Sequence, residues 1–257
     1  MMANRRILFF IAMHKDVPLP TRRGAFAALG LGAFRPTTQL ESYSDGTGNS
    51  IADKNAHYSE LTGWYWIWKN VADLDFVGLC HYRRYFLLYP RHPYFTSAKL
   101  YIEPIAENLN MLTAPMTSLF VEQALATADV IVPRRQNLTM SLKAQYIKEH
   151  LPQYWDVFVE AIKETCPDFR DRIHRFDQTC EAHLYNMMIA RKSFFDAYMS
   201  RLFAITDWME RTMPFPADPY QGRVPAFIAE RFFTFYLDVT GARIVEVPVA
   251  ITDANAW

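Results

Sequence analysis

Basic side chains follow three segments that the sequence predicts to be buried strands. His14–Lys15, His81–Tyr85 and Arg134–Arg135 each come directly after an apolar run. In an open α/β sheet, ligands bind beyond the carboxyl ends of the strands, so we expect these clusters to meet at one cleft. Lys and Arg number 27, as do Asp and Glu, so positive potential in this chain would be local. The pattern predicts a site for a phosphate-bearing ligand, and a nucleotide diphosphate is the first candidate.

The three basic clusters differ in what else they could be. His81–Tyr85 interleaves arginines with tyrosines, a combination that permits planar stacking together with bidentate contacts to an anion. Basic pairs such as Arg134–Arg135 are also common on solvated loops. A purely structural interpretation of that pair therefore stays open.

Two further segments carry groups that could move a proton. On the predicted helix 225–237, Glu230 and Arg231 interrupt an otherwise apolar sequence, which is the pattern of either a structural ion pair or a pair in a site. Glu181 and His183 lie just ahead of a predicted strand at 186–190. A carboxylate or a histidine within hydrogen-bond reach of an acceptor hydroxyl can act as its general base.

Several familiar nucleotide and hydrolase motifs are absent from the sequence. It has no G-x-x-x-x-G-K-[ST] loop, no G-x-G-x-x-G after a strand and no G-x-S-x-G. Its acidic D-x-D, Asp73–Asp75, precedes a strand and so should lie at the edge of the sheet opposite the cleft. We assign no metal site. His14, His81 and His183 could meet in the fold, but lone histidines are more often packed or hydrogen-bonded.

Alternating apolar runs and helical patterns should position these residues. We expect one α/β domain over residues 1–257 with a mostly parallel central sheet flanked by helices. The segment 22–39 reads as loop with a short helical piece. The expected strands are 7–12, 75–80, 129–133, 186–190 and 243–251, and the expected helices are 50–70, 154–165, 194–209 and 225–237.

Composition sets the broad class. With 51% hydrophobic residues the chain can bury a large core, and its zero net charge argues against nucleic acid as a partner. Three scattered cysteines form neither a disulfide framework nor a CxxC metal motif. No apolar stretch is long enough to span a bilayer. We expect a cytoplasmic protein.

Several short strings resemble one bacterial family of capsule and O-antigen proteins, which was long described as a domain of unknown function and later linked to galactofuranosyltransferase activity. The likeness covers nearly the whole chain. At the turn this chain reads Asn49-Ser50-Ile51 where the family is expected to show Asn-Ile-Ser, which leaves the role of Ser50 open. The strings are Met13–Lys15, Asp45 with Asn49–Ile51, Lys54–Asn55, Glu60–Thr62 with Tyr65–Asn70, Gly78–Phe86, His183–Ile189 and Ala229–Arg231.

The resemblance implies a GT-A-like, Rossmann-related fold, UDP-galactofuranose as the nucleotide-sugar donor, and a lipid-linked or polysaccharide acceptor. Glu230, His183 and Glu181 are the candidates for orienting the acceptor or serving as base. No cofactor is assigned, and Mg²⁺ or Mn²⁺ assistance stays open because arginines could stabilise the diphosphate leaving group. Combined with strand-end position, the resemblance predicts donor binding by His14, Lys15, Asp45, Lys54, Asn55, His81, Arg83, Arg84 and Arg231.

Two rival functions use the same features. A nucleotide-sugar hydrolase or phosphotransferase would use the same basic cleft, and a non-catalytic glycan-binding module would use exposed Trp and Tyr. Three basic strand ends have no purpose in a glycan-binding module, which favours the transferase. A lipid-linked acceptor would also bring the protein to the inner face of the cytoplasmic membrane.

Overall fold

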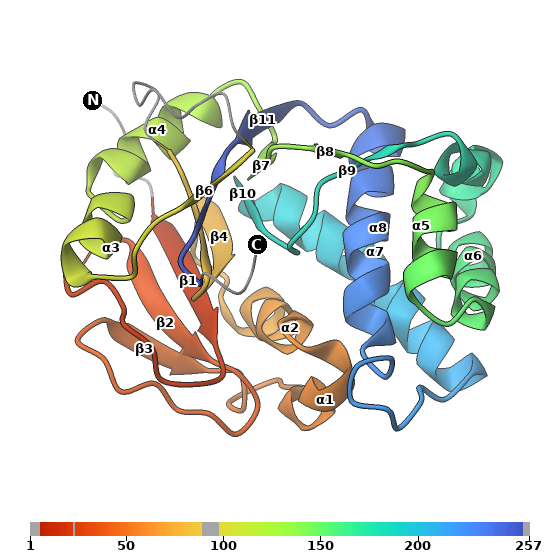
Figure 1. The fold of residues 1–257 in the computed structure, drawn as a ribbon, viewed down its shortest axis with the longest axis horizontal. Coiled ribbons are helices and arrows are strands. Elements are labelled where there is room, and N and C mark those ends of the chain that lie inside the picture. Colours follow the sequence, from red (N-terminus) through yellow and green to blue (C-terminus); the bar gives the residue numbers. More distant parts are fainter. Residues whose placement is uncertain (1–5, 23, 89–97, 254–257) are drawn as a thin grey trace.

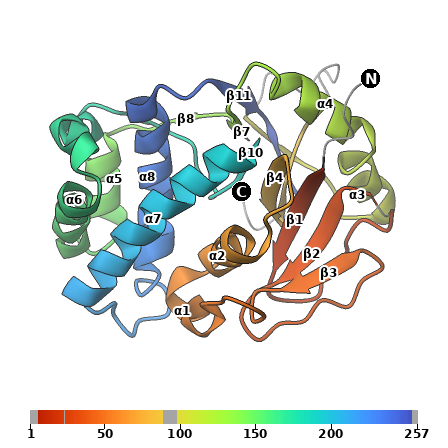
Figure 2. The same cartoon turned by 180° about the vertical axis from the view of Figure 1, so that it is seen from behind.

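The computed structural model describes residues 6–22, 24–88 and 98–253 and contains a mixed β-sheet with helices packed against it (Figures 1 and 2). The main path of the sheet has the order β11-β7-β10-β4-β1-β2-β3. Neighbours from β3 through β4 are parallel, and β11 is parallel to β7. The predicted α/β class with a mostly parallel sheet is confirmed. These strands are β1 (Ile7–Met13), β2 (Phe26–Gly30), β3 (Glu41–Ser44), β4 (Phe76–His81), β7 (Val130–Pro133), β10 (Met188–Arg191) and β11 (Ile244–Val247).

Strand β10 runs antiparallel to both of its neighbours, β4 and β7. The strands β4 and β7 therefore point in the same direction, and their carboxyl ends share one edge of the sheet with that of β1. However, β10 separates β7 from β4. Of the three strands with basic residues after them, which we expected to be adjacent, only β1 and β4 are neighbours, so the expected adjacency is wrong for β7.

Strand β1 shows why the sheet is covered on both faces. Successive side chains of a strand point to opposite faces. Phe10 and Ala12 belong to one hydrophobic cluster, whereas Phe9, Ile11 and Met13 belong to the other. An uninterrupted apolar strand of this kind is stable only between two apolar layers, which matches its prediction as a buried strand.

The helices divide between the two faces. One cluster is formed with the larger group of helices, and the other with α3 and α4 together with the short strands β5, β6 and β12. The first group comprises α2 (Leu61–Asn70), α5 (Leu142–Glu149), α6 (Gln153–Thr165), α7 (Lys192–Thr212) and α8 (Val224–Thr240), and the second α3 (Ala106–Leu112), α4 (Met116–Ala124), β5 (Arg84–Phe86), β6 (Lys99–Tyr101) and β12 (Val249–Ile251). The remaining elements are η1 (Ala52–Lys54), α1 (Asn55–Tyr58), η3 (Pro167–Asp177), β8 (Gln136–Asn137) and β9 (Glu181–Ala182).

Helix α8 passes through the interior and carries much of the site. Pro225 stands in its first turn, where its missing N–H costs nothing, and Gly241 ends it with φ of 63°. Nearly all its residues are buried. Helices α6, α7 and α8 agree with the predicted helices 154–165, 194–209 and 225–237, and α8 contacts the segment before β10 through hydrogen bonds.

Three sequence predictions need correction. The segment 22–39, expected to be a loop with a helical piece, contains the fully buried strand β2, because pairing with β1 outweighs the loop signal of its glycines. The expected helix 50–70 is broken at Ser59, whose φ is 48°. The expected strand 243–251 divides at Pro248, which cannot continue the ladder: β11 pairs with β7, and β12 pairs with β5 and β6.

Over the three described ranges, no helix has both the length and the apolar character needed to cross a membrane.

Candidate functional site

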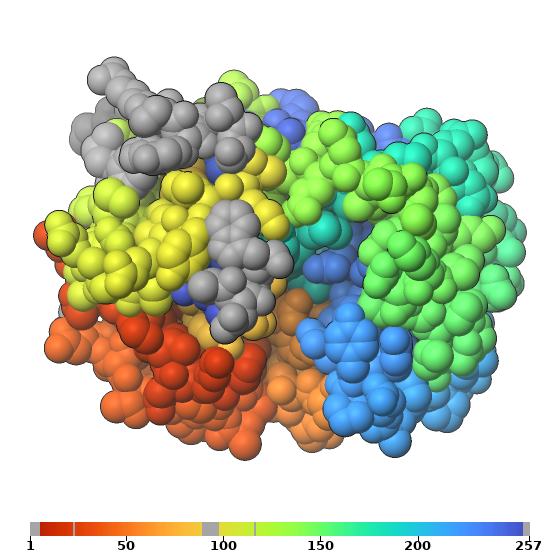
Figure 3. Space-filling model, viewed as in Figure 1, coloured from red at the N-terminus to blue at the C-terminus, as the bar shows by residue number. Residues whose placement is uncertain are grey.

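A cleft of about 610 Å³ lies where β1 and β4 end, between these strand ends, α1 and the first half of α8. The surface is hollowed in this central region, between the red-to-yellow and the green-to-blue parts of the chain (Figure 3). The residues with polar side chains that line it are His14, Asn55, Ser59, Glu60, His81, Arg83, Arg84, Tyr185, Tyr220, Arg223 and Glu230.

The tight turn from β4 to β5 presents the basic cluster. His81 pairs with Arg84 across this turn, which leaves Tyr82 and Arg83 at its tip. The His14 ring, which follows β1, lies 5.3 Å from the ring of Tyr82 between centroids. Because β1 and β4 are parallel neighbours, their ends bring the first two predicted basic clusters together.

The cleft arginines keep much of their hydrogen-bonding capacity. Arg83 reaches Asp253 at 3.6 Å, and Arg223 donates from Nε to the Ser59 hydroxyl at 2.9 Å. Within the described ranges, Arg84 and Arg223 have no carboxylate partner within ion-pair distance, and the buried Nε atoms of Arg83 and Arg84 have no hydrogen-bond partner. Burial, followed by the charge of Arg83, lowers the pKa of Arg84. An anion in the cleft would satisfy these groups.

Both histidines of the cleft are neutral at pH 7. Burial, reinforced by Arg83, lowers the pKa of His14 and lowers that of His81 further. Charging either ring would place another cation beside the arginines. The histidines can therefore act as hydrogen-bonding groups in the cleft, while the positive charge comes from the arginines.

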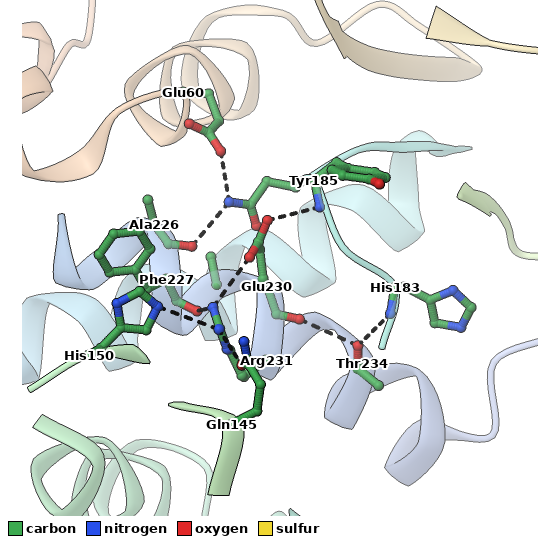
Figure 4. A network of polar contacts seen from close by, with 12 residues as sticks. Glu60, Gln145, His150, His183, Tyr185, Ala226, Phe227, Glu230, Arg231 and Thr234 are labelled. Carbon is green, nitrogen blue, oxygen red and sulfur yellow. Dashed lines mark hydrogen bonds and ion pairs between the residues drawn. The ribbon is translucent and has the colours of Figure 1, made fainter. Parts of the chain in front are cut away.

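Two carboxylates enter the same cleft but have different partners (Figure 4). Glu230 accepts the Tyr185 N–H at Oε1 over 2.9 Å, and its Oε2 lies 3.3 Å from Nη1 of Arg231. Among the described residues, the Glu60 carboxylate accepts one hydrogen bond, at Oε1 from Nδ2 of Asn186 over 2.8 Å. Its Oε2 is left for a ligand. The sequence interpretation had chosen Glu230 and overlooked Glu60.

The backbone is strained beside these carboxylates. In the described part of the chain, the non-glycine residues with positive φ are Ser59, Tyr185 and Asn186, at 48°, 83° and 48°. All three positions border the cleft, since Ser59 and Tyr185 line it and Asn186 contacts Glu60. Such conformations persist where surrounding contacts hold them, and they concentrate at functional sites.

Asp45 lies behind the cleft wall, and its side chain is fully buried. It accepts the Gly32 N–H at 3.1 Å and the Thr62 hydroxyl at 2.5 Å. Gly32 has φ of 59°, a conformation that favours glycine. Thr62 in turn accepts from Asn55, which lines the cleft. Asp45 therefore contacts the wall of the cleft through Thr62 and does not line the cleft itself.

Three other predicted donor-binding side chains do not line the cleft. Lys15 is exposed and lies 5.7 Å from the ring of Tyr82, while Lys54 pairs with Glu210 at 2.7 Å. Arg231 is 3% exposed and donates to the Phe227 carbonyl and to Gln145. These three side chains do not contribute charge to the cleft, because they lie outside its lining or already have partners.

The candidates Glu181 and His183 line a second hollow rather than this cleft. Arg135, from the third basic cluster, pairs there with Glu181 at 2.8 Å and with Glu246 at 2.6 Å. The His183 backbone N–H donates to Thr234 on α8. Arg135 of the third basic cluster therefore lies outside the cleft that holds the first two clusters.

Metal ligation has no obvious centre in this arrangement. Over residues 6–22, 24–88 and 98–253, no group of three or more His, Cys, Asp or Glu side chains is placed to hold a metal ion. His14 and His81 lie 6.2 Å apart between ring centroids, but His183 lines the other hollow. The Asp73–Asp75 motif lies at the opposite edge, where Arg6 contacts both acids.

Five polar residues of the cleft had no role in the sequence interpretation: Ser59, Glu60, Tyr185, Tyr220 and Arg223. Glu60 and Tyr185 stood inside the family-like strings, which was a usable signal. Arg223 stands in the Pro- and Gly-containing segment before α8, and only the fold brings it to Ser59. No local pattern would have selected it.

A mixed sheet covered on both faces, with an arginine-rich cleft at the carboxyl ends of β1 and β4, defines an α/β protein, and the structural likeness given below supports the expected GT-A-like fold. The chain belongs to the family described as a domain of unknown function (DUF4422), whose sequence model matches residues 8–241. This agrees with the expected membership of a family described as a domain of unknown function, and the matched description names no activity.

A solved structure described as the apo structure of the WbbM bifunctional glycosyltransferase is similar to this chain, with a TM-score of 0.83 at 21% sequence identity. The match covers 96% of this chain and 45% of that one, so the chain spans less than half the length of that protein. At this identity the likeness establishes a shared fold. No curated protein matches the chain.

Proposed function

We propose that this chain is a glycosyltransferase that moves a sugar from a nucleotide-diphosphate donor to a hydroxyl of a glycan acceptor. The observation that carries the proposal is the cluster of Arg83, Arg84 and Arg223 on one cleft, where among the described residues Arg84 and Arg223 have no carboxylate partner and the buried Nε atoms of Arg83 and Arg84 have no hydrogen-bond partner. Guanidinium forks match the oxygens of a diphosphate, and the cation–π contact of Arg84 with Tyr185, at 4.7 Å, holds one fork in place.

In the proposed reaction the acceptor oxygen attacks the anomeric carbon while the bond from that carbon to the diphosphate oxygen breaks. The electron pair of the broken bond stays on the diphosphate, where the arginines stabilise the added charge. The acceptor hydroxyl loses its proton to a general base. One displacement of this kind inverts the anomeric centre.

Glu60 is the proposed base. Both Glu230 oxygens have protein contacts, whereas Glu60 keeps Oε2 without a donor among the described residues and lines the same cleft. Asn186 fixes the Glu60 carboxylate through its other oxygen. A base held in this way needs little reorganisation when the acceptor arrives.

The finer proposal follows the family resemblance. It takes UDP-galactofuranose as donor and a lipid-linked or polysaccharide acceptor in capsule, O-antigen or exopolysaccharide synthesis. Residues 1–257 act as one transferase domain, in the cytoplasm at the inner face of the membrane. Mg²⁺ or Mn²⁺ would have a secondary role, because the arginines already supply charge to the diphosphate. The structural likeness to WbbM, a bifunctional glycosyltransferase, supports the reaction class.

A thermal-shift screen tests the donor cleft first. We expect UDP and UDP-sugars to raise Tm, because a ligand at one hundred times its Kd stabilises the native state by about 2.7 kcal/mol. Persistence of the shift in chelator is expected if arginines hold the diphosphate. No shift with any nucleotide would reject the donor cleft and favour a glycan-binding module.

Product analysis then separates transferase from hydrolase. With UDP-galactofuranose and an acceptor present, the expected products are UDP and a lengthened glycan. Free galactose released at the same rate with and without acceptor would identify a nucleotide-sugar hydrolase instead.

A further inference from the structure

A second hollow of about 630 Å³ lies beside the proposed donor cleft. Phe227 and Glu230 line the cleft, and Thr234, Leu237 and Gly241 line the second hollow. Residues spaced three or four apart share one face of a helix. The two hollows therefore follow one another along one face of α8 and its C-terminal end. Each helical turn between them adds about 5.4 Å along the helix axis.

The segment before β10 joins the same two hollows. Tyr185 lines the cleft, and His183, two residues earlier, lines the second hollow. Both backbone N–H groups donate to α8, that of Tyr185 to Glu230 and that of His183 to Thr234. These two hydrogen bonds, whose four residues are labelled in Figure 4, give the two hollows a common wall. A short extended ligand could contact both.

The charges of the second hollow do not suit a diphosphate. Its arginine, Arg135, is bonded to Glu181 and to Glu246. Asp238 also lines the hollow and pairs with Arg175. The donor cleft holds arginines without such partners, whereas here the positive charge is already neutralised. The polar groups that remain suit a neutral ligand with several hydroxyls.

His183 provides a specific receptor for such a hydroxyl. Its side chain is 7% exposed, and Nδ1 lies 2.9 Å from the Pro133 carbonyl oxygen. A carbonyl only accepts, so Nδ1 carries the hydrogen and Nε2 of the neutral ring is an acceptor. Nε2 faces Oε1 of Glu246 at 3.5 Å. That Glu246 oxygen already accepts from Nε of Arg135 at 2.6 Å, whereas Nε2 of His183 has no donor among the described residues, and a ligand hydroxyl supplies one.

We propose that the second hollow binds the saccharide chain of the acceptor, a neutral polyhydroxylated glycan, while its terminal hydroxyl reaches Glu60 in the cleft. This inference rests on the proposed transferase function. The proposal assigns His183 and Glu181 to acceptor binding in place of their predicted catalytic roles. Both residues then lie one or two helical turns from the reacting centre.

Cys180 offers a direct test. It lines the hollow and is exposed, whereas Cys80 and Cys166, the other cysteines of the chain, are buried. A bulky maleimide should therefore attach at Cys180 and fill the hollow. The probes are UDP-galactofuranose as donor and two acceptors, the octyl glycosides of galactose and of a galactose disaccharide.

We expect labelling to lower kcat/KM for the disaccharide at least tenfold and for the monosaccharide at most twofold, and to leave the UDP thermal shift unchanged. The Cys180→Ser variant must not respond to the reagent. The octyl disaccharide, and not UDP, should also slow alkylation of Cys180. Full activity of the labelled protein on the disaccharide would overturn the acceptor-site proposal.

A substitution reaches the same hollow without a reagent. A Cβ at Gly241 meets no atom within 4 Å, and asparagine tolerates its φ of 63°, so Gly241→Asn should fold with an added side chain at the hollow. Gly24→Asn is the matched control, since a Cβ there is also unobstructed. We expect only Gly241→Asn to raise the KM for the disaccharide. Absence of UDP binding by the wild-type protein would instead reject the proposed function.

Discussion

The backbone N–H of Tyr185 donates a 2.9 Å hydrogen bond to Oε1 of Glu230. This bond holds a residue with φ of 83° beside the cleft, and the next residue, Asn186, orients Glu60. The two carboxylates therefore have separate tasks. Glu230 maintains the backbone of the segment, and Glu60 faces the cleft.

Replacing Glu60 by glutamine removes the proposed base but keeps an oxygen that can accept from Asn186. General bases contribute about 10²- to 10⁴-fold to rate, so Glu60→Gln should reduce kcat for transfer by a factor in that range. The Kd for UDP should change less than threefold. The value of kcat is measured as UDP release from UDP-galactofuranose. Turnover within fivefold of wild type would assign the base to another residue.

Replacing Glu230 by glutamine should act first on stability. The amide oxygen can still accept the Tyr185 N–H, but the ion pair with Arg231, at 3.3 Å, is lost inside the protein. We expect a loss of about 1–3 kcal/mol in the free energy of unfolding, measured by urea denaturation. An unchanged stability together with a complete loss of kcat would instead make Glu230 the catalytic carboxylate.

Arg84 should account for a large share of UDP affinity. A hydrogen bond to a charged group contributes about 1.5–3 kcal/mol, so Arg84→Ala should raise the Kd for UDP about 10- to 150-fold, measured by calorimetry. Arg84→Lys should recover part of the loss, because lysine keeps the charge without the planar fork. Arg211→Ala is the control, on an exposed arginine of α7. Equal affinities for all variants would place the diphosphate elsewhere.

The role of Asp45 can be separated from donor binding. Thr62→Val removes the 2.5 Å hydrogen bond to its buried carboxylate, which should cost about 1–3 kcal/mol of stability. Because Thr62 also accepts from Asn55 at the cleft, UDP affinity should fall only severalfold. A large loss of UDP affinity at unchanged stability would restore the predicted donor contact of Asp45.

Much of the fold could be predicted from local pattern, and the exceptions share a cause. The strands β1, β4 and β7 are uninterrupted apolar runs, and α6 and α8 have clear helical periodicity. Strand β2 reads FAALG, which carries little β propensity by itself and forms through pairing with β1. Local sequence does not contain that partner.

The site was predictable to the extent that strand ends define it. His14, His81, Arg83 and Arg84 follow β1 and β4, and the structure places them in one cleft. Arg223 reaches the cleft by a contact 164 residues away in sequence, with Ser59. The break at Ser59 also turns the predicted helix 50–70 into two pieces and leaves Glu60 at the start of α2. These placements come from tertiary contacts, and spacing alone does not reveal them.

Acid should destabilise the protein in a defined window, and His150 isolates part of the effect. Burial, then the charge of Arg231, lowers its pKa from 6.5 to about 4. The unfolded chain therefore binds more protons between these values, so the stability that the neutral ring contributes is present above pH 6.5 and is lost as pH falls toward 4. The same sign holds for His14, His81 and His183, whose pKa values burial also lowers.

The variant His150→Phe keeps an aromatic ring against Phe227, which lies 3.8 Å away between centroids. Its Tm should fall less than that of wild type between pH 7 and pH 4.5, and parallel losses in the two proteins would show that the His150 ring titrates alike in the folded protein and in the unfolded chain.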